Sequence, residues 1–312
     1  MPEPRETLLI TGAGSGLGLA STLWLAARKY RVFGAVLTDA EAGRLRREAQ
    51  QRGLPVDILQ MDVTRRSDIE RAVDSLMRAA GRLDGVIQFA GLGLRGFFED
   101  LTLEEVKNVF EVNVFGVMSV TQCVLPHMRK ARRGRLILTS SSAGRTGSMS
   151  ISGYSATKFA GEGFAECLAQ EVRPFNIYVS LLEPGLIDTP HFGINRNRAR
   201  RAVDPASPYY LWFCQHEKIV DDILASHRFS PDDVARQVHK ILQARRPRLR
   251  YIVGPGARII INLRRYIPGE WFERAYWAVL RRKVTRPRVQ VTSLSSSAFE
   301  PRHEKATADS AR

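Results

Sequence analysis

The sequence predicts an α/β fold, a doubly wound parallel sheet of about seven strands in a three-layer αβα arrangement. Short apolar runs alternate with segments of helical periodicity from the N-terminus to Val253. Each helical segment is long enough to return the chain for another parallel strand. Such crossovers are right-handed, so a parallel sheet with helices on both faces follows.

Six apolar runs are expected to form strands: Leu8–Thr11, Val32–Leu37, Val56–Met61, Gly85–Phe89, Leu136–Thr139 and Ile177–Leu182. Five segments between them have helical periodicity: Leu17–Arg28, Ala40–Arg52, Asp68–Ala80, Leu103–Arg129 and Ala156–Arg173. A seventh strand is expected at Arg250–Val253, after a helix over Pro231–Ala244. Ser230 and Asp232–Asp233 are typical of the start of that helix.

The composition is that of a soluble globular protein with a sizeable core: 312 residues, 44% hydrophobic and 25% charged. Cys123, Cys167 and Cys214 are widely spaced, which argues against a disulfide framework or a metal cluster and favours a reducing, cytoplasmic location. The N-terminus lacks the pattern of a signal peptide. The chain has no run of about 18 uncharged apolar residues, so no transmembrane helix is expected.

The formal net charge is +15, and the excess is uneven. Arg196–Arg201, Arg245–Arg250 and the chain from Arg258 onward carry much of it. Basic proteins can bind nucleic acid or anionic membranes, but no nucleic-acid-binding motif accompanies the charge. We therefore expect a solvated basic surface that attracts an anionic cofactor, and no nucleic-acid partner.

The chain is expected to form one main domain over residues 1–254. Within it, residues 190–228 interrupt the alternation with Arg, Pro and aromatic residues. A long excursion at the carboxyl edge of a parallel sheet can build a ligand cleft, so we interpret this segment as substrate-covering. Residues 255–292 form a basic amphipathic extension, and residues 293–312, rich in Ser, Ala and charge, are expected to be disordered.

A glycine-rich turn, Thr11-Gly-Ala-Gly-Ser-Gly-Leu-Gly18, follows the first expected strand and opens a helix. It satisfies TGxxxGxG through Gly12, Gly16 and Gly18. Glycine permits the tight turn and lets phosphates approach the backbone, and the helix N-terminus supplies free N–H groups. Glycine also serves the shape of many α/β turns, so the position after the first strand gives the motif its weight.

Two further patterns indicate proton chemistry. Tyr154-Ser-Ala-Thr-Lys158 places Tyr154 and Lys158 on one helix face. A neighbouring ammonium lowers the pKa of a phenol, which can then exchange a proton with a substrate oxygen. Thr139-Ser-Ser-Ser-Ala-Gly144 follows the fifth strand, where a hydroxyl faces the ligand crevice. Each pattern alone also fits ordinary packing or an ordinary turn.

Together and in this order, these patterns resemble the short-chain dehydrogenase/reductase family, with its Rossmann fold, and particularly its retinol and hydroxysteroid dehydrogenase-like branch. The match runs from about Thr7 to Gly254. It implies an oxidoreductase that moves a hydride between a nicotinamide cofactor and the CH–OH group of an alcohol.

The resemblance implies a role for each residue of the site. Tyr154 is the general acid/base, and Lys158 lowers its pKa and binds the nicotinamide ribose. Asn113, in Val112-Asn-Val-Phe-Gly116, holds a water that links Lys158 to solvent. Ser141 orients the substrate; Ser140 and Ser142 are close alternatives.

The cofactor contacts implied by the resemblance fall in seven places along the chain. Asp62 and Val63 lie where the family contacts adenine, and the motif after the sixth strand holds the nicotinamide carboxamide. The full set is Gly12, Ser15, Gly16, Leu17, Gly18, Asp39, Asp62, Val63, Ala90, Gly91, Asn113, Tyr154, Lys158, Pro184, Gly185, Ile187 and Thr189.

One departure concerns the fourth strand, where the family has Asn-Asn-Ala-Gly and this chain has Gln88-Phe89-Ala90-Gly91. Ala90 and Gly91 still allow close approach of the cofactor. The missing asparagines put in doubt the hydrogen bonds that steady the strand. Gln88, with a longer amide, is a candidate substitute.

The second strand favours NAD over NADP. NADP selection usually needs a cation for the 2′-phosphate, and Leu37-Thr38-Asp39 supplies none there. Asp39 either contacts the ribose or caps the next helix.

The aromatic covering segment indicates a small hydrophobic alcohol or carbonyl substrate, such as a steroid, retinoid or lipid. Packing of the covering helices is an equal alternative for these side chains. The candidate lining residues are Phe192, Tyr209, Tyr210, Trp212 and Phe213.

Three expectations concern the assembly. Residues 259–283 either pack on protein or make weak peripheral contact with a membrane surface. The resemblance implies a homodimer or homotetramer through the helices over Leu103–Arg129 and Ala156–Arg173. The alternative function is a cofactor-binding regulatory or scaffold protein without turnover; the intact Ser141, Tyr154, Lys158 and Asn113 argue against it.

Overall fold

The computed structural model describes residues 6–187, 196–226 and 229–285. Seven parallel strands form one sheet in the order β3-β2-β1-β4-β5-β6-β7, which confirms the expected doubly wound α/β fold. Each strand begins and ends within two residues of its expected range. The strands are β1 (Thr7–Thr11), β2 (Arg31–Val36), β3 (Val56–Gln60), β4 (Gly85–Gln88), β5 (Gly134–Thr139), β6 (Ile177–Pro184) and β7 (Arg250–Val253).

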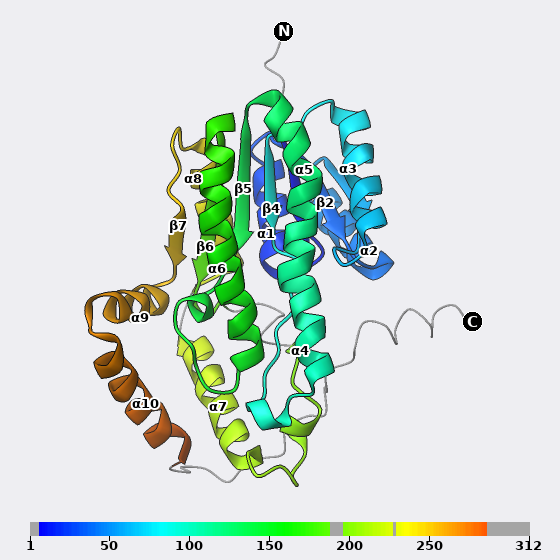
Figure 1. Ribbon diagram of the computed structural model, residues 1–312. Helices are drawn as coiled ribbons and strands as arrows, with labels where there is room; N and C mark the ends of the chain where they lie inside the picture. The colour runs from blue at the N-terminus through cyan, green and yellow to red at the C-terminus, as the bar shows by residue number, and fades with distance from the viewer. Residues whose placement is uncertain (1–5, 188–195, 227–228, 286–312) are drawn as a thin grey trace, which may run out of the picture.

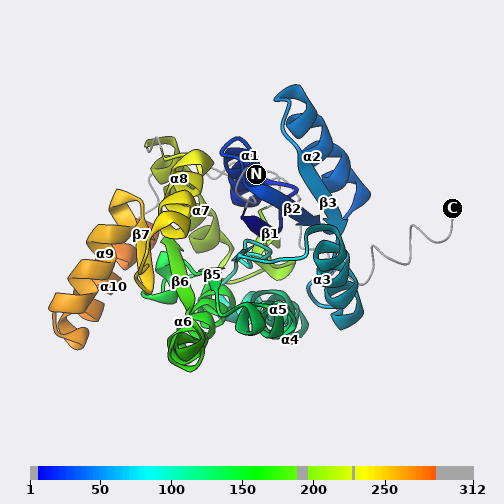
Figure 2. The ribbon, with the colours of Figure 1, turned by 90° about the horizontal axis from the view of Figure 1, so that it is seen from above.

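Helices cover both faces of the sheet (Figures 1 and 2). Viewed from above, α1 and α8 lie on one face, and α3, α5 and α6 lie on the other (Figure 2). The helices are α1 (Gly16–Ala26), α2 (Asp39–Gln51), α3 (Arg66–Ala80), α4 (Leu103–Phe110), α5 (Val117–Ala131), α6 (Ser152–Val172), α7 (Tyr210–Ser226), α8 (Pro231–Gln243), α9 (Pro255–Tyr266) and α10 (Gly269–Thr285). The three-layer arrangement follows.

A hydrophobic core lies on each face of the sheet. Leu9, Val86 and Leu136 point toward α3, α5 and α6, whereas their strand neighbours Leu8 and Ile137 point toward α1, α2 and α8. This alternation follows from the two-residue period of a strand. Both faces are apolar, as expected for a parallel sheet that is buried on both sides.

One expected helix is more complex than its periodicity predicts. The segment Leu103–Ala131 contains α4, a π-helical turn at Glu111–Gly116 and then α5. Among the described helices, this segment alone is long and apolar enough to cross a membrane. Within its most apolar stretch of 18 residues, 44% is buried inside the protein. Its apolar side packs on α3, α6 and the sheet, which accounts for its composition.

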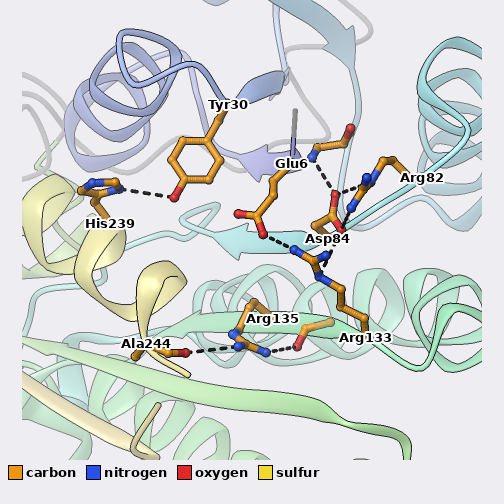
Figure 3. Close-up of polar contacts among 10 residues, drawn as sticks. Glu6, Tyr30, Arg82, Asp84, Arg133, Arg135, His239 and Ala244 are labelled. Carbon is orange, nitrogen blue, oxygen red and sulfur yellow. Dashed lines mark hydrogen bonds and ion pairs between the residues drawn. The ribbon is translucent and has the colours of Figure 1, made fainter. Parts of the chain in front are cut away.

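An ion network closes the amino-terminal end of the sheet (Figure 3). Asp84 accepts a hydrogen bond from the backbone N–H of Thr7 at 2.8 Å and pairs with Arg82 at 2.6 Å. Arg133 pairs with Glu6 and approaches Asp84 at 3.5 Å. These contacts tie β1, β4 and β5 together at the end of the sheet where the chain enters the strands, and leave the carboxyl end for the site.

The C-terminal extension is two helices, where the sequence predicts one amphipathic segment. α9 and α10 lie beyond β7, at the edge of the molecule (Figures 1 and 2). The chain turns between them at Ile267-Pro268, because proline cannot continue the hydrogen bonding of α9. The tail at residues 293–312 lies outside the described residues.

Candidate functional site

The glycine-rich turn lies between β1 and β4, where the strand order reverses and an α/β sheet binds its ligand. Gly12 (φ +68°) and Gly16 (φ +49°) have the left-handed backbone that favours glycine. A Cβ on Gly12 would lie 2.8 Å from the backbone nitrogen of Ala90, so the turns after β1 and β4 are in contact. Side chains at this position would close the crevice.

The amino end of α1 opens directly from this turn. Ser15 precedes the helix, makes no side-chain capping bond, and is followed by Gly16, Leu17 and Gly18 in the first turn. A Cβ on Gly18 would stand 2.0 Å from the carbonyl oxygen of Gly12, so only glycine fits there. Uncapped amides at a helix N-terminus attract a phosphate. The turn therefore fits the pyrophosphate of a dinucleotide.

The end of β2 differs from the sequence-based expectation. Thr38, and not Asp39, caps α2: its hydroxyl accepts from the backbone N–H of Glu41 at 3.2 Å. The capping role considered for Asp39 is therefore wrong, and Asp39 is the exposed first residue of α2. The Glu41 carboxylate accepts from the backbone N–H of Leu37 at 2.8 Å and packs against Gly14.

Glu41 was missed from the sequence, although a signal existed. A threonine followed three residues later by glutamate is the capping-box pattern, which fixes both side chains at a helix start. In this protein that geometry brings the Glu41 carboxylate beside the glycine-rich turn.

Asp62 and Val63 follow β3 at the same edge of the sheet. One carboxylate oxygen of Asp62 accepts from the backbone N–H and hydroxyl of Thr64, at 2.9 and 2.8 Å. Val63 is buried and packs against Gly116 in the π-helical turn. Val63 thus fixes the helix that carries Asn113.

Asn113 is buried in the π-helical turn, and its side chain clamps the chain after β4. Its Oδ1 accepts from the backbone N–H of Leu92 at 2.8 Å, and its Nδ2 donates to Leu92 O at 2.8 Å and to Thr157 Oγ1 at 3.1 Å. These bonds fix the position of the Asn113 side chain, and the implied role of holding a water stays a prediction. Asn113 thus joins the β4 turn to α6.

Gln88, which stands where the family has asparagine, has two hydrogen-bond partners. Its Nε2 donates to Thr121 Oγ1 at 2.9 Å and Val117 O at 3.3 Å, which ties β4 to α5. The next turn is steadied by Thr11, whose hydroxyl accepts from the backbone N–H of Ala90 at 3.1 Å. Gly91 is exposed, beside the Asn113 amide. The amide of Gln88 therefore holds the end of β4 against a helix.

Ser141, Tyr154 and Lys158 lie together at the carboxyl end of β5 and the start of α6. A hydrogen bond joins the Ser141 and Tyr154 hydroxyls. The Lys158 ammonium donates to Thr139 O at 2.8 Å and stands 5.5 Å from the centre of the Tyr154 ring. Ser140, in contrast, is 3% exposed, with its hydroxyl enclosed by protein. Ser142 begins the short helical turn after Ser141.

Burial dominates the acid–base properties of this group. It raises the pKa of Tyr154 to about 12, while Ser141 and Arg95 oppose the rise. It lowers the pKa of Lys158 to about 8, and the nearby Glu162 carboxylate opposes the fall. The expected lowering of the Tyr154 pKa by Lys158 is therefore not found. Lys158 loses its proton at a lower pH than Tyr154, so the ammonium is gone before the phenol titrates.

A buried charge network surrounds Lys158. Glu162, one helical turn further along α6, pairs with Arg250 at 2.9 Å. Glu183 on β6 pairs with Arg145 at 3.1 Å and with Arg250 at 3.2 Å. Burial and the Glu162 charge raise the pKa of Glu183. This network is not evident from the sequence; the spacing of Glu162 four residues after Lys158 is its one local signal.

The residues after β6 are placed as follows. Pro184 and Ile187 are buried, and the backbone N–H of Gly185 donates to Val253 O at 3.0 Å. A Cβ on Gly185 would lie 3.1 Å from Ala257, so α9 packs directly against this motif. Thr189 lies outside the described residues, and so does Phe192.

A second buried ion cluster fixes the covering segment. Glu217 of α7 pairs with Arg95 at 2.5 Å, Arg198 at 2.8 Å and Arg196 at 3.3 Å. Burial alone would raise the pKa of Glu217, but the three guanidinium groups reverse this and lower it. Arg95 belongs to the chain after β4 and also lowers the pKa of Tyr154. The cluster thus joins the cover to the site.

The aromatic residues of the covering segment mainly pack on protein. Phe213 is fully buried, and Tyr209 stacks on Phe97 at 5.0 Å and donates to Glu99 at 2.7 Å. Trp212 is 44% exposed. Packing of the cover therefore accounts for Phe213 and Tyr209.

Fold and site together define an α/β oxidoreductase with a nicotinamide dinucleotide crevice. The model of the short chain dehydrogenase family matches residues 6–199, and the chain belongs to this family. It is 35% identical over 256 residues to a 3-ketodihydrosphingosine reductase of Bacteroides thetaiotaomicron, covering 82% of this chain and 90% of the relative. It is 32% identical over 257 residues to bovine retinol dehydrogenase 8, covering 80% and 82%. These relatives confirm the resemblance to the retinol and hydroxysteroid dehydrogenase-like branch.

Solved structures agree with this assignment. A short-chain dehydrogenase/reductase from Burkholderia phymatum, in complex with NAD, has the same fold, with a TM-score of 0.74 and 22% identity over 94% of this chain and all of that chain. An actinorhodin polyketide ketoreductase with NADPH gives a TM-score of 0.65 and 26% identity, covering 81% and 92%. A nicotinamide cofactor is therefore supported for this chain.

Proposed function

We propose that the protein transfers a hydride between NAD and a hydrophobic alcohol or carbonyl compound, with Tyr154 as the general acid/base. The meeting of the Ser141 and Tyr154 hydroxyls beside Lys158, at the edge that holds the glycine-rich turn, carries this proposal. The nicotinamide, when bound, supplies or accepts the hydride. Ser141 and Tyr154 hold the substrate oxygen, and Tyr154 exchanges a proton with it.

The acid–base state of the site favours carbonyl reduction. With its pKa raised to about 12, the Tyr154 phenol stays protonated at neutral pH and serves as a proton donor. Lys158, with a pKa of about 8 and its ammonium 5.5 Å from the centre of the Tyr154 ring, is placed to return a proton to Tyr154 near neutral pH. Oxidation of the alcohol needs the reverse transfer and is expected to gain as the pH rises.

The end of β2 supports the preference for NAD over NADP. Asp39 and the Glu41 carboxylate beside Gly14 give this edge negative charge, which repels a 2′-phosphate. We expect kcat/KM to be higher with NADH than with NADPH at equal concentration. A clear preference for NADPH would overturn this part of the proposal.

The names of the relatives support a lipid-like substrate, since one reduces 3-ketodihydrosphingosine and another is a retinol dehydrogenase. The test is a panel of 3-ketodihydrosphingosine, retinal and a ketosteroid, with butanone as the short, hydrophilic control. Loss of absorbance of the reduced nicotinamide reports turnover. Turnover of at least one lipophilic compound well above butanone is expected. No turnover of any compound, with normal cofactor binding, would favour the scaffold alternative.

We also propose a homo-oligomer through α5 and α6. Phe115 next to α5 is 54% exposed, and Phe159 on α6 is 42% exposed. Burial of two such rings would stabilise an interface between copies. Light scattering of the wild type should give a multiple of 35.0 kDa, and Phe159→Glu should reduce it. A monomeric wild type would contradict the proposal.

A further inference from the structure

The hairpin of α9 and α10, residues 255–285, has one face that is already packed on protein. Ala257 and Ile261 of α9 are buried, as are Phe272 and Val284 of α10. Tyr276 stacks on Phe272 at 5.5 Å and its hydroxyl donates to Ser148 at 3.3 Å. α10 also packs against α7. This inner face explains why the hairpin is held in place, but not the composition of its other side.

The outer face of α9 is apolar and exposed. Ile259, Leu263 and Tyr266 are 61%, 45% and 76% exposed, and their spacing of four and three residues places them in one row along the helix. A helix that faces water normally carries charged or polar residues in such a row. Three large hydrophobic side chains therefore lie on a surface that no described part of the protein covers.

α10 exposes two large aromatic residues of its own. Trp271 is 74% exposed and Trp277 is 60% exposed. Two of the four tryptophans of the chain thus lie on one exposed helix. Trp and Tyr favour the level of the lipid head groups, where one edge of the ring meets hydrocarbon and the other meets water.

The same hairpin is strongly basic. It has seven Arg and Lys residues against two Glu, an excess of five positive charges. The guanidinium of Arg265 lies 5.6 Å from the exposed Tyr266 ring, whereas that of Arg264 lies 5.9 Å from the Phe272 ring of the inner face. The basic residues are Arg258, Arg264, Arg265, Arg274, Arg281, Arg282 and Lys283.

Charge decides between the occupants of this surface. A second copy docked on it about a two-fold axis would bring like charges together, because such an interface uses the same patch on both subunits. An anionic bilayer offers negative phosphates for the arginines and an apolar layer for the row of hydrophobic side chains. Membrane contact and packing are alternatives in the sequence; the inner face of the hairpin is packed on protein, and its exposed side chains leave membrane contact open to test.

We propose that the α9–α10 hairpin docks the protein on an anionic membrane surface, lying in the interface with Ile259, Leu263, Tyr266, Trp271 and Trp277 toward the lipid. The hairpin lies at the edge of the molecule beyond β7, away from α2, so a flat surface can reach it (Figure 2). Binding depends on this surface and is independent of the proposed catalytic activity.

The test is co-sedimentation of the full chain with sucrose-loaded vesicles, either phosphatidylcholine alone or phosphatidylcholine with about one third phosphatidylserine. The wild type should bind the anionic vesicles at least tenfold more strongly. Arg281→Gln with Arg282→Gln should lose about tenfold or more, since each basic residue near an anionic surface contributes about fivefold. The matched control is Arg46→Gln with Arg47→Gln, the same charge change on exposed residues of α2 at the opposite edge.

The apolar contribution is tested by Trp271→Ser with Trp277→Ser, against Phe98→Ser, a ring that is 70% exposed elsewhere. The tryptophan double variant should lose at least tenfold in binding, and Phe98→Ser should bind as the wild type does. NAD binding by each variant checks folding and is expected to be unchanged. If a variant fails to fold, a blue shift of wild-type tryptophan fluorescence with anionic vesicles gives the same answer.

Three results would overturn the proposal: no binding of the wild type to anionic vesicles, equal losses in hairpin variants and controls, or no blue shift. A change of oligomeric state in the hairpin variants, without vesicle binding by the wild type, would assign the surface to a second copy.

Discussion

Gly18→Ala adds one methyl group where the first turn of α1 meets the chain before it. The added carbon would stand 2.0 Å from the carbonyl oxygen of Gly12, whereas ordinary contact begins at 3.4 Å, so the two must separate by about 1.4 Å. The added carbon would meet backbone atoms of Gly12 and Ala13, so no rotation of a side chain can relieve the contact. A misplacement of about 1 Å can cost about 100-fold in the rate of an enzyme. The same factor applied to cofactor affinity corresponds to about 2.7 kcal/mol of binding free energy.

The dissociation constant for NADH, measured by isothermal titration calorimetry, should therefore rise about 100-fold in Gly18→Ala. Overpacking should also lower the free energy of unfolding by about 1–3 kcal/mol. The matched control is Gly43→Ala on α2, where the added carbon would meet only the end of the flexible Arg47 side chain, at 3.4 Å. That change should stabilise by about 0.5–1 kcal/mol and leave binding unchanged. Wild-type affinity in Gly18→Ala would refute the placement of the dinucleotide at this turn.

Three further predictions concern charge and packing. Burial and Arg95 lower the pKa of His216 to about 4, against 6.5 unfolded, so only the unfolded chain gains this proton as the pH falls from about 6.5 to 4. The free energy of unfolding therefore falls by about 3 kcal/mol as the pH falls through this range. Urea unfolding of His216→Gln should not show this loss, and a variant with the same pH dependence as the wild type would contradict the prediction. Glu162→Gln removes the negative charge that raises the pKa of Lys158, so this pKa should fall further. The alkaline fall of kcat/KM should then move to lower pH by on the order of one unit. An unmoved pH profile would exclude a role for Glu162 in tuning Lys158. Phe213→Ala should lower the free energy of unfolding by about 3–5 kcal/mol, since the ring is fully buried under the cover; a loss below about 1 kcal/mol would contradict that.

The sheet was predictable because its signals are local. Apolar runs and glycine or serine turns fix strands and their carboxyl ends, and parallel order follows from the crossovers. The positions of Gly12, Ser141, Tyr154 and Lys158 follow from this order. The π-helical turn around Asn113 was not predictable, since it leaves the helical periodicity of its segment nearly unchanged.

Ion pairs between distant segments could not be predicted. Arg95 and Glu217 are 122 residues apart, and Arg250 and Glu162 are 88 apart; each pair forms only because separate elements meet in the fold. Burial of Tyr154 itself raises the pKa of its phenol, in the direction opposite to the lowering expected from Lys158. Spacing on one helix face shows that two groups are neighbours, but not how much water each retains.

Tyr154→Phe tests the central claim most directly, because it removes one hydroxyl and keeps the ring. NADH binding by calorimetry and turnover of the best lipophilic substrate by nicotinamide absorbance are measured on the same preparation. We expect the NADH dissociation constant to stay within about twofold of the wild-type value and kcat to fall by about 100-fold to 10,000-fold, the usual contribution of a general acid. Turnover retained within tenfold of the wild type, at the same NADH affinity, would contradict the assignment of Tyr154 as the proton donor.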